Sequence, residues 1–339
     1  MKPDRIAQLG CVAALITTAC EKEQPALDTR EKVVATVQPS AFATSIPSAP
    51  SVSAKPEPVG KCPPDMVKVA DRFCIDRYEA TMYDTKLGRR ASRHYHPSQY
   101  SVEKRYQFFK EADEAWSAYQ EAVKAADGDI VNAGIDASYD LEAGPPTLFK
   151  MPIPKPEPWQ FEEYFKVKAV SEAGQMPNAF LSGIIAKSAC KNAGKRLCTE
   201  AEWVTACRGE NNTKFPYGDT YEEGACNIYR QGHVAQKLHG HYNWLSDPRL
   251  NLVPIQGQIL LEKTGNRPRC KSKWGDDGIY DMVGNLDEWI DDPRGTFLGG
   301  FYSHQTDKGC EKKEEGHVFK YYDYSLGVRC CLDLILNQD

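Results

Sequence analysis

Short apolar runs mark where regular structure begins in this chain. Met66–Val69 and Phe73–Asp76 are rich in apolar residues, and the three residues between them, Ala70–Arg72, suit a turn. Two such runs separated by a short break are typical of paired strands. We therefore expect the folded body to begin near Cys62 with two strands.

A longer segment, from Val102 to Ala126, carries apolar residues at helical spacing. Side chains at this spacing lie on one side of a helix, so the segment is predicted to be an amphipathic helix. We expect Trp116 and Tyr119 to face the core rather than to form a platform for a ligand. The apolar positions are Tyr106, Phe109, Trp116, Tyr119 and Val123.

Capping residues predict two further helices. Ser182 can cap a helix that continues through Asn192, and Gly194 suits the left-handed position that closes it. Thr199 and Glu202 have the spacing of a capping box. After residue 208 the chain is rich in turns and scattered short apolar runs, which predicts an irregular body that needs disulfides. One side of the second helix is formed by Trp203, Ala206 and Cys207.

The first residues have the pattern of a secretory signal. Lys2 and Arg5 precede the apolar run Leu9–Ala19, which is too short to span a bilayer. Small residues before Cys20 resemble a bacterial lipoprotein cleavage box, although Thr17 stands where Leu is usual. We expect residues 1–19 to be a signal peptide and Cys20 to be acylated. An ordinary signal peptide cut nearby is the alternative.

Both alternatives predict an exported protein in an oxidising compartment. With Cys20 acylated, we expect a lipid anchor in a bacterial membrane, most simply the outer membrane facing the periplasm. Residues 20–60 are rich in Pro, Ser and Ala, with Phe42 as their only aromatic residue. Such a segment buries too little apolar surface to fold, so we expect a disordered tether that reaches roughly 35 Å.

The cysteine count agrees with export. Of twelve cysteines, Cys11 lies in the expected signal and Cys20 at the expected lipid site, and the ten that remain can form five disulfides. No pair has the spacing of a zinc ribbon. The sequence alone leaves the pairing open. The ten residues are Cys62, Cys74, Cys190, Cys198, Cys207, Cys226, Cys270, Cys310, Cys330 and Cys331.

Charge and motifs exclude several function classes. The chain has 42 Lys and Arg against 47 Asp and Glu, without a basic stripe, so we do not expect nucleic acid as a partner. It lacks a nucleophile elbow, a zinc-protease motif and a phosphate-binding loop. The partner that composition does predict is the membrane, through the N-terminal lipid.

Five blocks in order resemble the formylglycine-generating, sulfatase-modifying-factor domain family. They cover about residues 62–332, except that most of 82–176 is insertion relative to the family. The resemblance implies an α+β, C-type-lectin-like fold over residues 61–335, with little regular structure and a partly helical insertion. The blocks are Pro63–Val67 with Phe73–Thr81, Ala189–Trp203 with Arg208–Gly209 and Phe215–Asp219, Gly278–Trp289, Gly299–Tyr302 and Leu326–Cys330.

The resemblance also implies disulfide pairs. It pairs Cys190 with Cys330, and by the same analogy Cys207 with Cys310. Pairing the remaining cysteines as Cys62–Cys74, Cys198–Cys331 and Cys226–Cys270 is a guess, because spacing does not fix connectivity.

The family's oxidation chemistry depends on two copper-binding thiols in the closing block. At those positions this chain has His304 and Gly309, and Cys310 lies one residue later. Because Cu(I) prefers soft thiolate ligands, copper and formylglycine formation are not expected here. Tyr302 and His304 are the weak catalytic candidates that remain. His94 and His96 in the insertion are interpreted as surface residues rather than as metal ligands.

The resemblance implies structural calcium as the cofactor. Carried over by position, Asp281 and Glu288 supply carboxylates and Gly284 and Leu286 supply carbonyls, which suits a cation that prefers several hard oxygens. The alternative is that the two carboxylates only accept hydrogen bonds from loop amides. A second family site begins at the pair Asn227 and Ile228, but its other ligands do not align.

Two functional hypotheses follow. In the first, the chain is an exported lipoprotein that uses its lectin-like scaffold, without catalysis, to bind a peptide, glycan or protein. In the second, it is an oxidoreductase of altered type that acts on a peptide or peptide-derived substrate near Trp289, Tyr302 and His304, and iron is expected only there.

Overall fold

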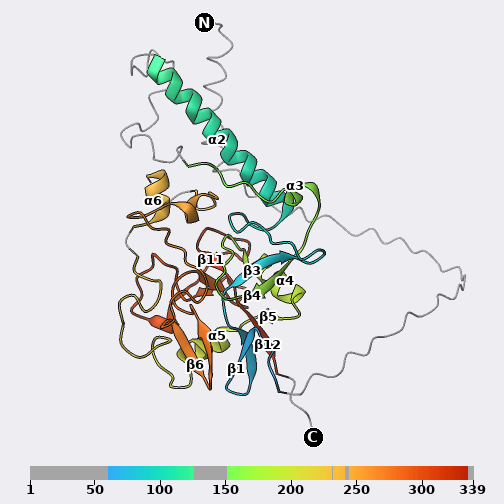
Figure 1. The fold of residues 1–339 in the computed structure, drawn as a ribbon, viewed down its shortest axis with the longest axis vertical. Helices are drawn as coiled ribbons and strands as arrows, with labels where there is room; N and C mark the ends of the chain where they lie inside the picture. The colour runs from blue at the N-terminus through green and yellow to red at the C-terminus, as the bar shows by residue number, and fades with distance from the viewer. Residues whose placement is uncertain (1–59, 126–150, 231, 241–243, 335–339) are drawn as a thin grey trace, which may run out of the picture.

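The computed structural model describes residues 60–125, 151–230, 232–240 and 244–334. The expected signal, Cys20 and almost all of the expected tether lie outside these residues. None of the described helices has both the length and the apolar composition needed to cross a bilayer. Figure 1 shows the folded body.

A four-stranded sheet joins the first and last described segments of the chain. Its order is β1-β2-β12-β5, and every neighbouring pair is antiparallel. The hairpin predicted near residue 70 is confirmed, since β1 and β2 have the predicted bounds. The strands are β1 (Met66–Val69), β2 (Phe73–Asp76), β12 (Cys330–Asp333) and β5 (Arg196–Leu197).

A second four-stranded sheet has the order β10-β9-β8-β11, with β8 and β11 parallel. Its strands are β8 (Asp287–Trp289), β9 (Phe297–Leu298), β10 (Lys313–Glu314) and β11 (Leu326–Gly327). Two further antiparallel pairs complete the strands: β3 (Ala80–Asp84) with β4 (Val167–Ser171), and β6 (Lys271–Trp274) with β7 (Asp277–Tyr280). Most strands after residue 208 are short, as the sequence predicts.

The helices follow the capping predictions. Ser182 caps α4 by accepting a hydrogen bond from the Ile185 amide, and Gly194 adopts φ +74° after its end. Thr199 and Glu202 form the predicted capping box of α5. The helices are α2 (Gln99–Ala125), α3 (Trp159–Glu162), α4 (Gly183–Asn192), α5 (Glu200–Arg208) and α6 (Val234–His239), with 3-10 turns at Leu250–Leu252 and Gly309–Glu311.

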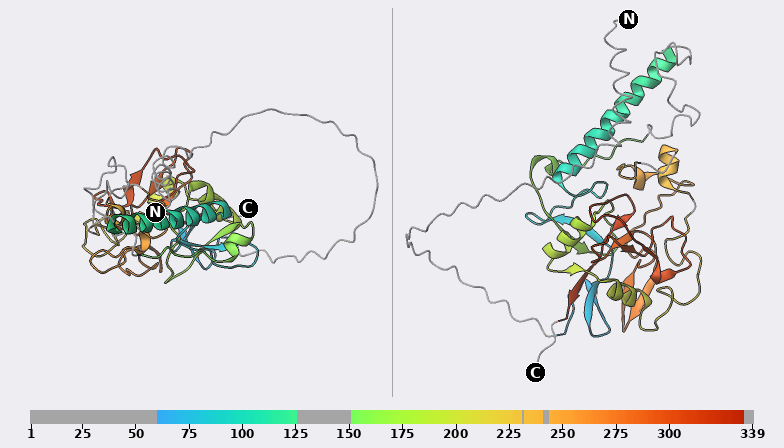
Figure 2. Two further views of the ribbon diagram at one scale, coloured as in Figure 1. Left: turned by 90° about the horizontal axis from the view of Figure 1, so that it is seen from above. Right: turned by 180° about the vertical axis from the view of Figure 1, so that it is seen from behind.

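The helix of the insertion begins three residues before the predicted Val102. Phe109 on this helix is buried, and an ion pair between Asp113 and Arg249 ties the helix to the body. The side chains of Trp116 and Tyr119 lie outside the described residues. Figures 1 and 2 show that the far half of α2 extends beyond the body.

The ends of the insertion belong to the body. Residues of β3 and β4 pair one to one, from Ala80 opposite Ser171 to Asp84 opposite Val167. The chain therefore leaves the body after β3 and returns to the same ladder at β4. Figure 1 shows α4 beside this ladder.

Five disulfides staple the body. Cys330 and Cys331 are neighbours on β12, and they tie this strand to α4 and to the turn before α5. Closing a loop of about a hundred residues limits the unfolded chain and stabilises the folded state by about 4–5 kcal/mol. All five pairs coincide with those expected from the resemblance and the guess: Cys62–Cys74, Cys190–Cys330, Cys198–Cys331, Cys207–Cys310 and Cys226–Cys270.

Candidate functional site

We call residues 299–312, between β9 and β10, the closing loop. This loop holds His304 against a buried carboxylate. The His304 side chain is 28% exposed, and its Nδ1 atom lies 3.6 Å from Oδ2 of Asp287 on β8. The imidazole also contacts the Phe301 ring, at 4.5 Å between centroids. Burial, with help from Lys312, lowers the pKa of His304 to about 4, and burial beside Asp323 raises the pKa of Asp287 well above its usual range. Both shifts favour the uncharged forms of the pair.

The second thiol position of the family is sterically closed. Gly309 has φ +56°, and a Cβ atom added to it would lie 2.2 Å from the Lys214 carbonyl oxygen. That oxygen accepts a hydrogen bond from the Cys310 amide at 2.9 Å. A cysteine at position 309 would require this backbone to move.

The residues at these positions therefore do not fit a copper-thiolate centre. Cys310 is fully buried and is bonded to Cys207. Every cysteine in the part of the chain that the structure describes is paired in a disulfide. A Cu(I) site needs thiolates, and none is present at the closing loop in this form.

The other candidates of the closing region lie inside the core. The Tyr302 hydroxyl is buried and donates a hydrogen bond to Asn251 at 2.9 Å. The Trp289 indole is buried as well and donates to the Leu181 carbonyl at 2.7 Å. An altered oxidase was expected to act near Trp289, Tyr302 and His304, and among these only His304 has a partly exposed side chain.

The expected calcium loop is built around a buried ion pair. The Glu288 carboxylate accepts hydrogen bonds from Arg329, at 2.6 and 2.7 Å, and from the Trp203 indole at 2.7 Å. Asp281 accepts one from the Gly265 amide at 2.7 Å. Asp281 thus has the alternative arrangement, in which a carboxylate accepts a hydrogen bond from a loop amide. Glu288 is held by side chains instead. Both oxygens of Glu288 are already engaged, so calcium there has to compete with Arg329.

Glu79 joins this cluster and was missed in the sequence. It is fully buried, and its carboxylate accepts hydrogen bonds from the Leu286 amide at 3.0 Å and from Asn285 at 2.6 Å. Burial and the nearby Asp281 and Glu288 raise its pKa well above the usual range. It stands in the opening block between Tyr78 and Ala80, and no local pattern in the sequence pointed to its burial.

The cluster contains more negative than positive charge. Three carboxylates, those of Glu79, Asp281 and Glu288, are buried near one guanidinium, that of Arg329. Burial is the main reason why the pKa of Asp281 is raised to about 7. Unpaired buried charge is costly, so a proton or a cation has to balance the excess. Calcium at this loop stays a prediction.

Asn227 provides an orphaned oxygen next to the loop. Its amide nitrogen donates to the Leu260 carbonyl and to Asn285, at 2.8 and 3.0 Å. Its Oδ1 atom is buried and has no hydrogen-bond partner. Such an atom suits a cation ligand, but over the described residues no group of three or more His, Cys, Asp or Glu side chains has the geometry to hold a metal. The adjacent Ile228 is buried in the core.

The two histidines of the insertion do not form a shared site. His96 is buried, with its ring nitrogens 2.9 Å from the Ser182 hydroxyl and 3.2 Å from that of Ser98. His94 is mostly buried, and its pKa is lowered to about 4 by burial. The expectation that they lie on the surface is therefore wrong for His96, which links the insertion to the cap of α4.

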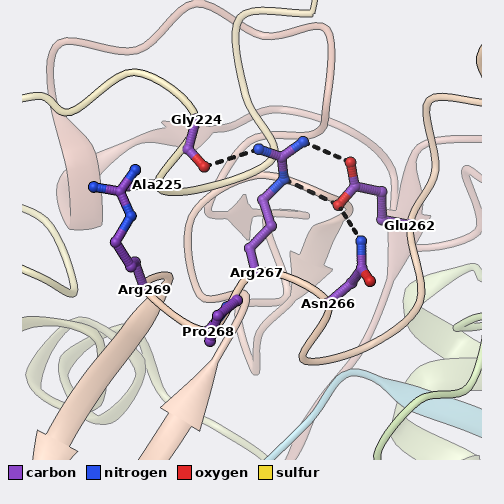
Figure 3. Close-up of a pocket in the computed structure, with 7 residues that line it drawn as sticks. All are labelled: Gly224, Ala225, Glu262, Asn266, Arg267, Pro268 and Arg269. Atoms are coloured by element: carbon purple, nitrogen blue, oxygen red, sulfur yellow. Dashed lines mark hydrogen bonds and ion pairs between the residues drawn. The ribbon is translucent and has the colours of Figure 1, made fainter.

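A polar hollow of about 250 Å³ lies beside the Cys226–Cys270 disulfide. Figure 3 shows the Arg267 guanidinium held between the Gly224 carbonyl and the Glu262 carboxylate. Arg269 stands apart from this network and pairs with Glu222 instead, at 2.8 Å. The lining residues are Gly224, Ala225, Glu262, Asn266, Arg267, Pro268 and Arg269.

The two arginines of the hollow differ in how firmly they are held. Arg267 makes a two-point contact with Glu262 and is 20% exposed. Arg269 is 59% exposed, and its partner Glu222 is 51% exposed. An exposed ion pair contributes at most about 1 kcal/mol, so an incoming anion can exchange with Glu222. The hollow thus has one fixed and one available guanidinium.

Comparisons with known proteins show which family the chain belongs to. The family model described as "Sulfatase-modifying factor enzyme 1-like domain" matches residues 36–331. A formylglycine-generating enzyme of Mycobacterium tuberculosis (strain ATCC 25618 / H37Rv) is 33% identical over 76 residues, which are 22% of this chain and 25% of that enzyme. The matched part thus spans about a quarter of the length of this curated relative.

Two solved structures are also similar in part. CarF has 14% identity and a TM-score of 0.31, over 47% of this chain and 68% of that one. PvdO from Pseudomonas aeruginosa has 17% identity and a TM-score of 0.28, over 49% of this chain and 64% of that one. The family model alone covers most of the chain. The chain therefore belongs to the family of proteins with a sulfatase-modifying factor enzyme 1-like domain.

Proposed function

We propose that this protein is an exported, lipid-anchored binding protein whose domain holds a partner without oxidising it. The observation that carries the proposal is the closed second thiol position at Gly309, where the Lys214 carbonyl occupies the space of a side chain. Because family oxidation chemistry requires two thiolates on copper, a domain with His304 and Gly309 there lacks the means for it. A scaffold without that centre can still bind.

The polar hollow next to Arg269 is our candidate for the binding site. Its volume of about 250 Å³ suits one anionic group of a larger ligand rather than a whole cofactor. Arg267 is oriented by Glu262, so it needs little ordering when a ligand arrives. Arg269 can turn from Glu222 to form a charge-assisted hydrogen bond to a carboxylate. An acidic peptide, or a glycan or protein that carries carboxylates, has this chemistry.

Binding of synthetic peptides tests this function. Hexaglutamate should bind measurably at low salt and hexaglutamine should not. Arg269→Glu should weaken hexaglutamate binding about tenfold, because it removes one cation and adds one anion beside the ligand. Arg294→Glu is the matched control, since Arg294 is 73% exposed and lies outside the hollow.

Two outcomes would contradict the proposal. Equal binding of both peptides, or an equal effect of both variants, would show that the hollow does not select anions. Oxygen uptake with a cysteine-containing peptide that disappears in His304→Ala would favour an oxidase of altered type instead. Incorporation of labelled palmitate that depends on Cys20 tests the lipid anchor separately.

A further inference from the structure

A second surface combines exposed apolar side chains with basic ones. Tyr164 is 77% exposed and Leu87 is 64% exposed, both high values for large apolar side chains. Leu87 lies at the tip of the turn that follows β3, and Tyr164 lies just before β4. The Thr85 amide donates to the Lys166 carbonyl at 2.9 Å, so the two segments are side by side. We call the two segments, residues 84–90 and 162–168, the β3–β4 patch.

The turn that presents Leu87 is rigid. The Asp84 carboxylate is buried and accepts hydrogen bonds from the amides of Lys86, Leu87 and Arg89. Gly88 adopts φ +65°, which glycine reaches without strain. Arg89 is fixed by an ion pair with Glu163 and by the Trp159 ring, 4.3 Å from its guanidinium carbon. The exposure of Leu87 is thus built into a well-braced turn.

A hollow of about 190 Å³ lies between the two segments of the patch. Lys86, Arg89 and Lys166 are among the residues that line it, together with Asp84 and Glu163. The segments 84–90 and 162–168 contain five Lys and Arg residues against three Asp and Glu residues, a net charge of +2. The whole chain has a net charge of −5, so the patch is locally basic on an acidic protein.

The combination of exposed apolar and basic side chains suits contact with an anionic membrane surface. Apolar and aromatic side chains that enter the interface, flanked by Lys and Arg that reach lipid phosphates, are how proteins rest on bilayers. The lipid anchor proposed at Cys20 would hold the body at an average distance of roughly 35 Å from the bilayer. We propose that the β3–β4 patch docks on the anionic phospholipid surface, with a headgroup phosphate in the hollow near Lys86 and Lys166. This inference builds on the proposed lipid anchor.

Vesicle sedimentation tests the docking without the lipid. Residues 60–339 are suitable, because this segment contains all five disulfides and all the described strands and helices. It should bind vesicles that contain about a third phosphatidylglycerol, and phosphatidylcholine vesicles much more weakly. Lys86→Glu and Lys166→Glu should each lower binding at least about fivefold, as expected for the loss of a basic residue at such a surface.

The apolar part of the patch is tested by a double variant. Leu87→Ser with Tyr164→Ser should lower binding about tenfold, because interfacial burial of both side chains is lost. Tyr100→Ser and Lys187→Glu are matched controls, since both residues are exposed and lie outside the patch. All variants change exposed side chains, and intact disulfides and circular dichroism would confirm their folding.

Equal binding to both kinds of vesicle, or no difference between patch and control variants, would overturn the docking. Palmitate labelling at Cys20 is read independently of this assay. Absence of labelling together with selective vesicle binding would contradict the lipid anchor and support the β3–β4 patch. Labelling without selective vesicle binding would contradict the patch alone.

Discussion

The closing loop around His304 and the buried cluster around Arg329 differ in how firmly their side chains are held. Arg329 is fully buried and makes hydrogen bonds to Glu288 and to the carbonyls of Asp76 and Tyr280. His304 is partly exposed and touches its neighbours through ring contacts and one carboxylate. Changing a residue of the cluster leaves buried charges unpaired, whereas changing His304 does not. The fold is therefore secured by buried charge pairs rather than by the side chains of the closing loop.

The largest expected effect concerns the disulfide that ties the closing loop to α5. Cys207→Ser with Cys310→Ser removes a bond that closes a loop of 103 residues, so the free energy of unfolding should fall by about 5 kcal/mol. Urea denaturation measures this loss. The corresponding change at Cys62 and Cys74, 12 residues apart, should cost about 3 kcal/mol. Equal losses would mean that loop closure does not explain the stabilisation.

A somewhat smaller loss is expected from the cluster itself. Arg329→Met should lower the free energy of unfolding by about 4 kcal/mol, because the carboxylates of Glu79, Asp281 and Glu288 lose their buried cation. Arg294→Met should cost much less, since Arg294 is 73% exposed. Urea denaturation at pH 7 compares the two variants. A loss at Arg329 as small as that at Arg294 would remove the argument that the cluster secures the fold.

Titration of His96 tests whether burial keeps imidazoles uncharged in both regions of the domain. Burial lowers the pKa of His96 from 6.5 to about 4, so the folded protein keeps this ring neutral. The unfolded chain binds a proton below pH 6.5, and stability is therefore lost as the pH falls from 6.5 towards 4, by about 3 kcal/mol at the end. His96→Asn should flatten this part of the stability profile. His304→Asn should flatten it to a similar extent, because burial lowers the pKa of His304 to about 4 as well. A profile that His96→Asn leaves unchanged would contradict the burial of this ring.

Local features of the fold could be predicted from the sequence because the residues that specify them are close together. The strands on either side of Ala70–Arg72, the Ser182 cap and the capping box at Thr199 each depend on a few neighbouring residues. The disulfide pairs were reached by resemblance and elimination rather than by any local signal. The helix of the insertion was predicted as an element, but not its start at Gln99.

The features that the sequence could not provide depend on distant segments. Glu79 meets Leu286 across about two hundred residues, and Gly224 meets Arg267 across forty-three. No periodicity or spacing in the sequence predicts either contact, because only the fold brings the two residues together. The closing of position 309 is of the same kind, since the Lys214 carbonyl comes from another loop. Burial of His96 likewise follows from contact with Ser182.

Competition for Cu(I) tests the central claim most directly. The disulfide-intact protein would be titrated against a chromophoric Cu(I) chelator at pH 7, and the metal taken from the chelator would be measured. With an imidazole at 304, a closed position 309 and Cys310 bonded to Cys207, the protein should take up no tightly bound copper. One equivalent of tightly held Cu(I), with oxygen uptake on addition of a cysteine-containing peptide, would contradict the account.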